Sequence, residues 1–166
     1  MNTRDILLIY EYNYWANKRI LDASANITQE QLDAPASFPY GGLRGTLFHI
    51  LEAEWAWRMY FQNDNWDAPD LNMADFPDLA SLQERWVQEE QEMRSYLAAL
   101  SDEILNGHRY YTTNEGEARD RILWHCLLHV VNHGTQHRSE AAALLTDYGS
   151  SPGDMDFTRF LNEYKP

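Results

Sequence analysis

The sequence predicts an all-α protein that folds as a four-helix bundle. Four segments of about twenty residues or more carry apolar side chains at the three- and four-residue spacing of an amphipathic helix, and the alternation typical of strands is nearly absent. The chain has 166 residues, of which 44% are hydrophobic, as expected for a globular domain with its own core. We therefore expect a single helical domain that covers residues 1–166.

The first expected helix runs from about Thr3 to about Ala25 and is ended by APASFPYGG, residues 34–42, which contains two prolines and two glycines. The second runs from about Leu43 to Asn63. Residues 64–78, DNWDAPDLNMADFPD, are acidic and have no apolar period, so we expect a loop. Such a loop can span the ~30 Å length of a twenty-residue helix, so the sequence allows an up-down-down-up bundle as well as a simple up-down one.

The third expected helix runs from about Asp78 to about Leu100. In HRYYTTNEGEAR, residues 108–119, β-prone residues stand on one side of Asn-Glu-Gly, which predicts a short hairpin. The fourth helix is expected from about Glu117 to Tyr148, because a glycine and a proline follow it at positions 149 and 152. Residues 154–164, DMDFTRFLNEY, predict a short terminal helix that packs on the outside of the bundle.

The charge balance is strongly acidic, and it bears on the partners that the chain can bind. Thirteen basic and twenty-six acidic side chains give a formal net charge of −13, which repels nucleic-acid backbones and anionic lipid surfaces. No window approaches the ~18 consecutive apolar residues of a membrane span. The N-terminal residues do not resemble a signal peptide, and Cys126 is the only cysteine. We therefore expect a cytoplasmic protein that binds neither nucleic acid nor membrane.

Four of the six histidines fall in HCLLHVVNHGTQH, residues 125–137, at intervals of four residues: His125, His129, His133 and His137. Neighbours at this spacing stand one above the other on one face of a helix, so two imidazoles can reach one metal ion with bonds of ~2.0–2.1 Å. Three cannot easily share one ion, because the outer two are ~12 Å apart along the axis. The stretch therefore contains at most one ligand pair, and the alternative is a polar stripe or histidines that form hydrogen bonds in the core.

The surroundings favour a metal site over these alternatives. Leucines and valines lie between the histidines, so this part of the helix is expected to be apolar nearly all round, where several charged imidazoles would be costly. A third ligand should come from another helix, and His49 in TLFHILEAEWAW is the obvious candidate. His108, beside the expected hairpin, is expected on the surface. A zinc-protease helix is excluded, since its first histidine is followed by glutamate and Gly134 follows His133 here.

Four segments of the chain resemble the DinB-like family, within the DinB/YfiT superfamily: NYWANKRIL, GGLRGTLFHILEAEW, HVVNHGTQHR and PGDMDF. The resemblance covers essentially the whole chain in the same order. It implies a four-helix bundle, commonly with up-down-down-up topology and often dimeric, with a divalent metal held by three histidines. By motif these are His49, His133 and His137, with His129 as a neighbour that supports the ligands and His125 as a structural residue.

The same resemblance implies a chemistry. Many relatives have His-His-Arg where this chain has Gln136, His137 and Arg138, and the ligand position is retained. Zinc and nickel both suit nitrogen ligands. Characterised relatives include S-transferases and an isomerase that use low-molecular-weight thiols, so we expect a metal-dependent enzyme that acts on a small molecule with such a thiol. The alternatives are a non-enzymatic metal-binding or stress-response dimeric scaffold and a metal-dependent hydrolase.

A few further residues are candidates for roles near the site. Glu140 shares the face of His133 and His137, and Glu52 lies about one turn after His49, so either carboxylate could orient an imidazole or act as a base. A surface salt bridge is the alternative for both. Cys126 is expected to be a small core residue. Three aromatic residues could line a pocket above the metal or simply belong to the core: Tyr10, Tyr14 and Trp57.

The aromatic content also bears on association. Six tryptophans and ten tyrosines are more than one core of this size needs. The surplus could cover helix faces that meet in a second copy of the chain. We therefore expect a homodimer.

Overall fold

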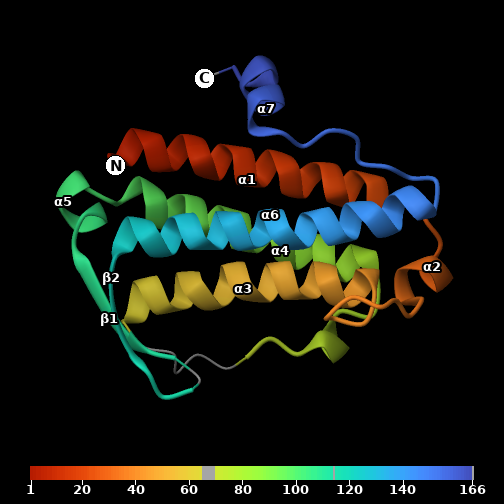
Figure 1. Ribbon diagram of the computed structural model, residues 1–166, viewed down its shortest axis with the longest axis horizontal. Helices are drawn as coiled ribbons and strands as arrows, with labels where there is room; N and C mark the ends of the chain where they lie inside the picture. The colour runs from red at the N-terminus through yellow and green to blue at the C-terminus, as the bar shows by residue number, and fades with distance from the viewer. Residues whose placement is uncertain (65–69, 114, 166) are drawn as a thin grey trace.

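The computed structural model describes residues 1–64, 70–113 and 115–165. These residues form a mostly helical protein with one small antiparallel sheet, as Figure 1 shows. The elements in chain order are α1 (Thr3–Ser24), α2 (Gln29–Asp33), α3 (Leu43–Asn63), the 3-10 helix η1 (Met73–Asp75), α4 (Leu79–Ala98), α5 (Asp102–Leu105), β1 (His108–Thr112), β2 (Ala118–Ile122), α6 (Leu123–Asp147) and α7 (Phe157–Glu163). The expected predominance of helix is confirmed.

The four long helices, α1, α3, α4 and α6, lie side by side (Figure 1). Helix α6 packs against both α1 and α3, and α4 packs against α3 and α1. In the view of Figure 1, α1 and α6 run from left to right, whereas α3 and α4 run from right to left. The chain after α3 therefore returns along the length of the helices before α4 begins.

Local sequence explains where the helices start. Asn2 caps α1 by accepting a hydrogen bond from the Asp5 backbone, and Asp5 bonds back to the Asn2 backbone. Asp78 and Ser81 form the same reciprocal arrangement at α4. These capping boxes satisfy backbone N–H groups that have no partner within the helix.

The core lies along the inner faces of the long helices. At one end the buried side chains include Leu47, Leu51 and Trp86, and at the other they include Ile6, Met93 and Leu127. The single cysteine, Cys126, is buried in the second group, as expected. Helix α7 packs against α1, where the Tyr12 ring contacts Phe157 and Phe160, so the expected terminal helix lies on the outside of the long helices.

The expected start of the fourth helix at Glu117 is wrong, because residues 118–122 form strand β2. This strand pairs with β1 in antiparallel register, with Tyr110 opposite Asp120, so the expected hairpin is confirmed. The backbone of Leu123 then donates to the Gly107 carbonyl across the base of the hairpin, and α6 begins there. Pairing of the backbone with β1 thus prevails over the local helical pattern at these residues.

Two short helices, α2 and α5, and η1 within the expected loop were not predicted. Each is five residues or fewer, which is too short to show a 3.6-residue apolar period. Residues 65–69 of that loop lie outside the described residues. None of the described helices combines the length and the hydropathy that a membrane span requires.

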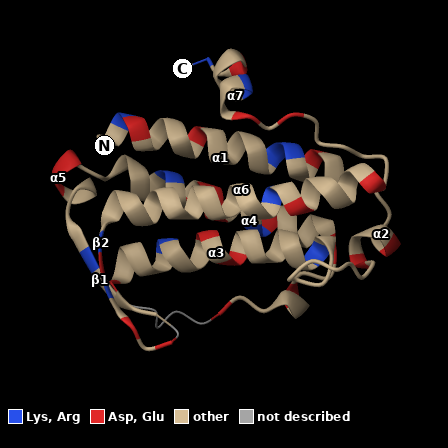
Figure 2. Cartoon of the chain, in the orientation of Figure 1, with Lys and Arg blue, Asp and Glu red and all other residues tan. Residues whose placement is uncertain are grey.

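Figure 2 shows how the acidic excess is distributed. Asp and Glu positions are spread over the long helices and the connecting segments, and Lys and Arg positions alternate with them. The described helices carry no continuous basic stripe of the kind that tracks a phosphate backbone.

Candidate metal centre

Helices α3 and α6 bring three histidines together from distant parts of the sequence. His49 lies on the second turn of α3, and His133 and His137 lie one turn apart in the middle of α6. One ring nitrogen from each residue lies within 4.8 Å of the others. These three residues, called here the histidine cluster, are the three that the sequence singled out as ligands.

The spacing within the histidine cluster suits a single metal ion. The Nε2 atoms of His49 and His133 are 3.0 Å apart. The centroid of the His137 ring lies 4.8 Å from the His49 centroid and 4.5 Å from the His133 centroid. Two nitrogens that each bind one ion at ~2.1 Å, with an angle of ~90–110° between them, lie ~3.0–3.4 Å apart. A hydrogen bond between the two imidazoles would place their nitrogens at the same distance. It would, however, engage the lone pair of only one ring in the cluster.

A carboxylate holds one of the three rings in place. The Nδ1 atom of His137 lies 2.8 Å from a carboxylate oxygen of Glu140, one turn further along α6. Donation from Nδ1 fixes the tautomer, so the Nε2 lone pair of His137 is left to face the other two rings. Glu52 is in an equivalent position next to His49, but at 3.7 Å its carboxylate is beyond hydrogen-bond distance.

Burial keeps the imidazoles of His49 and His133 uncharged. The pKa of His49 falls to about 4, chiefly because the ring is desolvated, with a further effect from His137. Desolvation also lowers the pKa of His133 to about 4, and the neighbouring histidines add to it. Both rings are therefore neutral at pH 7 and present lone pairs rather than positive charge, which is the state that binds a metal.

Tyr40, in the loop between α2 and α3, covers the histidine cluster from outside. Its ring stacks on His49 at a centroid distance of 3.6 Å and meets the edge of His137 at 5.3 Å. Two glycines allow this loop to pass so close to α3: a Cβ at Gly42 would lie 2.4 Å from the Ala34 carbonyl oxygen, and one at Gly45 2.0 Å from the Tyr40 carbonyl oxygen. The sequence did not predict a role for Tyr40, and the closely spaced glycines were the only signal.

A second group of polar residues lies behind the histidine cluster, and we call it the Arg138 cluster: Asn13, Asn17, Glu54 and Arg138. All four are buried. The Arg138 guanidinium donates to the side-chain oxygens of Asn13 and Asn17, at 2.6 and 2.7 Å. Both amides in turn donate to one carboxylate oxygen of Glu54, at 2.7 and 2.9 Å. The cluster ties α6 to α1 and α3 directly beside His137.

The Arg138 cluster also explains why glycine follows His133. A Cβ at Gly134 would lie 2.7 Å from a guanidinium nitrogen of Arg138 and 3.3 Å from the side-chain oxygen of Asn13. A larger residue would therefore displace the guanidinium. No pattern in the sequence identified the partners of Asn13 and Asn17.

The remaining histidines lie outside the cluster. His129 is exposed. The centroid of its ring lies 5.9 Å from the His133 centroid and 5.4 Å from the Trp57 centroid. His125 is also exposed and packs against Trp124. The expectation that this stretch of α6 is apolar nearly all round is therefore wrong, because one side of the helix faces solvent. His108 is exposed, as expected, and contacts Asp120.

The aromatic residues that could have lined a pocket above the metal take different positions. Tyr10 is buried in the core, where its hydroxyl donates to the Leu127 carbonyl. Tyr14 lines a groove between α1 and α4, whereas the histidine cluster lies between α3 and α6. Trp57 contacts His129, which is not a member of the histidine cluster. The core alternative thus describes both Tyr10 and Tyr14. The ring that lies over the histidine cluster is that of Tyr40.

Comparison with known proteins agrees with the resemblance of the sequence motifs. The family model described as the DinB family matches residues 1–165. The chain is also similar to Protein DinB of Bacillus subtilis (strain 168), with 26% identity over 168 residues, which covers 93% of this chain and 94% of that protein. A match of this extent includes all the elements that position the histidine cluster. The chain belongs to the DinB family.

Proposed function

We propose that this protein is an enzyme that uses a divalent metal ion, zinc or nickel, and a low-molecular-weight thiol to act on a small-molecule substrate. The observation that carries the proposal is the histidine cluster, in which three rings from two helices converge within 4.8 Å. Three neutral nitrogen ligands suit zinc or nickel and leave the full charge of the ion uncompensated. A divalent ion bound there would lower the pKa of a thiol or a water molecule placed beside it.

The residues around the histidine cluster have distinct parts in this proposal. Glu140 orients His137 through Nδ1 and so keeps its Nε2 lone pair directed at the ion. Tyr40 covers His49 and limits the access of water to the site. Glu52 is partly exposed beside His49, and burial raises the pKa of its carboxyl group, which suits a group that exchanges a proton with a bound substrate.

The proposal extends to architecture and assembly. The directions of the four long helices support an up-down-down-up four-helix bundle that forms a single domain over residues 1–166. We propose that two such chains form a homodimer, because exposed apolar side chains such as Leu7 and Leu128 remain on the helices. Sedimentation at micromolar concentration should give the mass of a dimer, and a monomer mass would contradict this.

The single buried cysteine supports a location in the cytoplasm.

A cobalt-substituted protein tests the chemistry. If a thiol binds beside the metal as a thiolate, glutathione, bacillithiol or cysteine should add a sulfur-to-cobalt charge-transfer band, which three nitrogens and a water do not give. The band should weaken as the pH falls, because protons compete for the thiolate. His133→Ala should abolish it, since this change breaks the pair on α6.

The control in this experiment is His125→Ala, which removes an exposed histidine of the same helix and should leave the band intact. An unchanged cobalt spectrum with all three thiols would contradict the thiol-dependent activity. Cobalt bound by the histidine cluster would then favour the hydrolytic or the non-enzymatic alternative. Failure of cobalt to bind at all would remove the metal site itself.

A further inference from the structure

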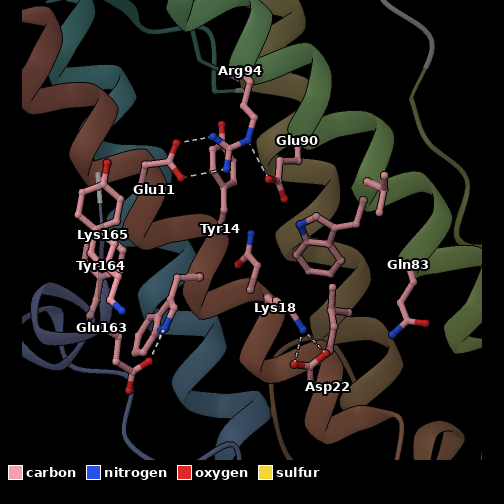
Figure 3. A pocket seen from close by; sticks show the side chains of 16 residues that line it. Glu11, Tyr14, Lys18, Asp22, Gln83, Glu90, Arg94, Glu163, Tyr164 and Lys165 are labelled. Atoms are coloured by element: carbon pink, nitrogen blue, oxygen red, sulfur yellow. Dashed lines mark hydrogen bonds and ion pairs between the residues drawn. The ribbon is translucent and has the colours of Figure 1, made fainter.

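A groove of about 590 Å³ lies between α1 and α4, next to α7 (Figure 3). Its wall is made by residues of α1, α4, α7 and the two residues that follow α7. The histidine cluster lies between α3 and α6, so the groove is a separate feature of the molecule. Its size falls within the ~300–1,000 Å³ of pockets that hold small organic molecules.

The middle of this groove is apolar and aromatic. Leu21 of α1, Trp86 and Val87 of α4 and Phe160 of α7 contribute to its wall. Val87 is 57% exposed although it is a β-branched apolar residue, and Trp86 beside it is buried. An exposed apolar surface of this kind favours an apolar ligand.

Five of the charged side chains at the edge of the groove are paired with one another. Arg94 forms ion pairs with Glu11 and Glu90, and Lys18 forms one with Asp22 at 2.6 Å, as the dashed lines in Figure 3 mark. A charged ligand would have to compete with these pairs and would meet opposite charges side by side. The wall therefore suits an uncharged ligand.

Two polar atoms in the wall have no hydrogen-bond partner within the part of the chain that the structure describes. They are the indole nitrogen of Trp86 and the hydroxyl oxygen of Tyr14, and both are buried. A buried donor without a partner is costly, so an acceptor brought into the groove would be favoured. The Arg94 guanidinium lies over the Tyr14 ring, with its Cζ atom 4.2 Å from the ring centre, so Tyr14 lies at the charged edge of the groove and Trp86 in its apolar middle.

We propose that the groove between α1 and α4 is a second binding site, for an uncharged and largely apolar small molecule that carries an acceptor oxygen. The apolar part of the ligand packs on Leu21, Val87 and Phe160, and its oxygen accepts a hydrogen bond from the Trp86 indole. This site is independent of the metal centre, because none of its lining residues belongs to α3 or α6.

Nile red is a suitable probe, since it is uncharged, apolar and carries a carbonyl oxygen, and its fluorescence rises in apolar surroundings. We expect saturable binding of one dye per chain and quenching of tryptophan emission. Val87→Arg, which places a long charged side chain in the groove, should weaken binding at least about 10-fold. Ile104→Arg is the matched control, because Ile104 is a similarly exposed apolar residue of α5 outside the groove, and it should leave binding unchanged.

Two further variants test the hydrogen bond. Trp86→Phe keeps an aromatic ring but removes the indole N–H, and it should weaken binding about 5- to 10-fold. Tyr14→Phe removes the other unpartnered donor and should have no effect. Equal effects of these two variants would overturn the role of Trp86, and retention of one metal ion per chain in both would show that the fold and the metal centre are intact.

Other occupants of the groove give different results. Equal binding of the dye by wild type, Val87→Arg and Ile104→Arg would overturn the site. So would a wild-type dimer that binds no dye and that Val87→Arg converts to monomers, since the groove would then be covered by a second copy of the chain.

Discussion

The histidine cluster and the Arg138 cluster both bring together residues of α3 and α6, yet their polar atoms are satisfied in different ways. In the Arg138 cluster, one guanidinium, two amides and a carboxylate alternate donors and acceptors at 2.6–2.9 Å. In the histidine cluster, three bases face one another, and two of their Nε2 atoms lie 3.0 Å apart. The first group is complete within the protein, whereas the second brings together lone pairs that suit a cation. Buried polar residues therefore indicate a ligand site only where their donors and acceptors do not match.

The largest effect should come from removing members of the histidine cluster. Protein purified from cells should carry about one divalent ion per chain, and His49→Ala, His133→Ala and His137→Ala should each lose it, because two imidazoles make a weak site. Elemental analysis measures this directly. His125→Ala removes a histidine that lies outside the cluster and should keep its metal. Equal metal content in all four variants would show that the ligands are elsewhere.

Removing the cation of the Arg138 cluster should destabilise the fold. Arg138→Ala leaves the carboxylate of Glu54 buried, without the charge that compensates it, and should lower the free energy of unfolding by about 3–5 kcal/mol. Urea unfolding followed by circular dichroism measures the loss. Arg58→Ala breaks a similar buried pair with Glu89 between α3 and α4, and it should be comparably destabilising. A loss below about 1 kcal/mol for Arg138→Ala would mean that the cluster is not a structural unit.

Glu140 offers a smaller and more specific change. Glu140→Gln weakens the bond that orients His137, so metal affinity should fall about 10- to 100-fold while the fold is retained. Competition with a chromophoric chelator gives the affinity. Glu52→Gln is the matched variant on α3, and because Glu52 is 3.7 Å from His49 its effect should be less than that of Glu140→Gln. If Glu52→Gln had the larger effect, the two carboxylates would have been assigned the wrong way round.

The metal-free protein should show a pH dependence of stability that arises in the histidine cluster. His49 and His133 have pKa values of about 4 in the folded chain and ordinary values near 6.5 when unfolded. Between these values the unfolded state binds more protons, so stability should be lost as the pH falls from about 6.5 to about 4. Urea midpoints across this range measure the loss. A double variant, His49→Phe with His133→Leu, should reduce the slope, and an unchanged slope would assign it to other groups.

Much of this arrangement could be predicted from the sequence, because it is local. The four-residue spacing of the histidines on α6 predicted one ligand pair, and the apolar neighbours of His49 predicted a third ligand. The choice of His133 and His137 as the pair came from the resemblance of the motifs to the DinB-like family. The partners of Arg138 could not be predicted in the same way. Asn13, Glu54 and Arg138 meet only after three helices pack, and no spacing in the sequence fixes which faces come into contact.

The start of α6 shows a second limit of sequence interpretation. Residues 118–122 join a strand because β1 offers backbone partners, and that pairing is invisible in the helical pattern that continues from Leu123. Tyr40 was missed for a related reason. It reaches the histidine cluster through the path of a glycine-containing loop rather than through any periodic signal.

Anomalous scattering from crystals of protein purified without added metal would test the central claim most directly. The account predicts one peak between α3 and α6, about 2.0–2.2 Å from the Nε2 atoms of His49, His133 and His137, with an absorption edge that identifies zinc or nickel. The result that would contradict it is a set of crystals in which the cluster holds no anomalous peak and the Nε2 atoms of His49 and His133 remain joined by a hydrogen bond, even after the crystals are soaked in zinc and in nickel.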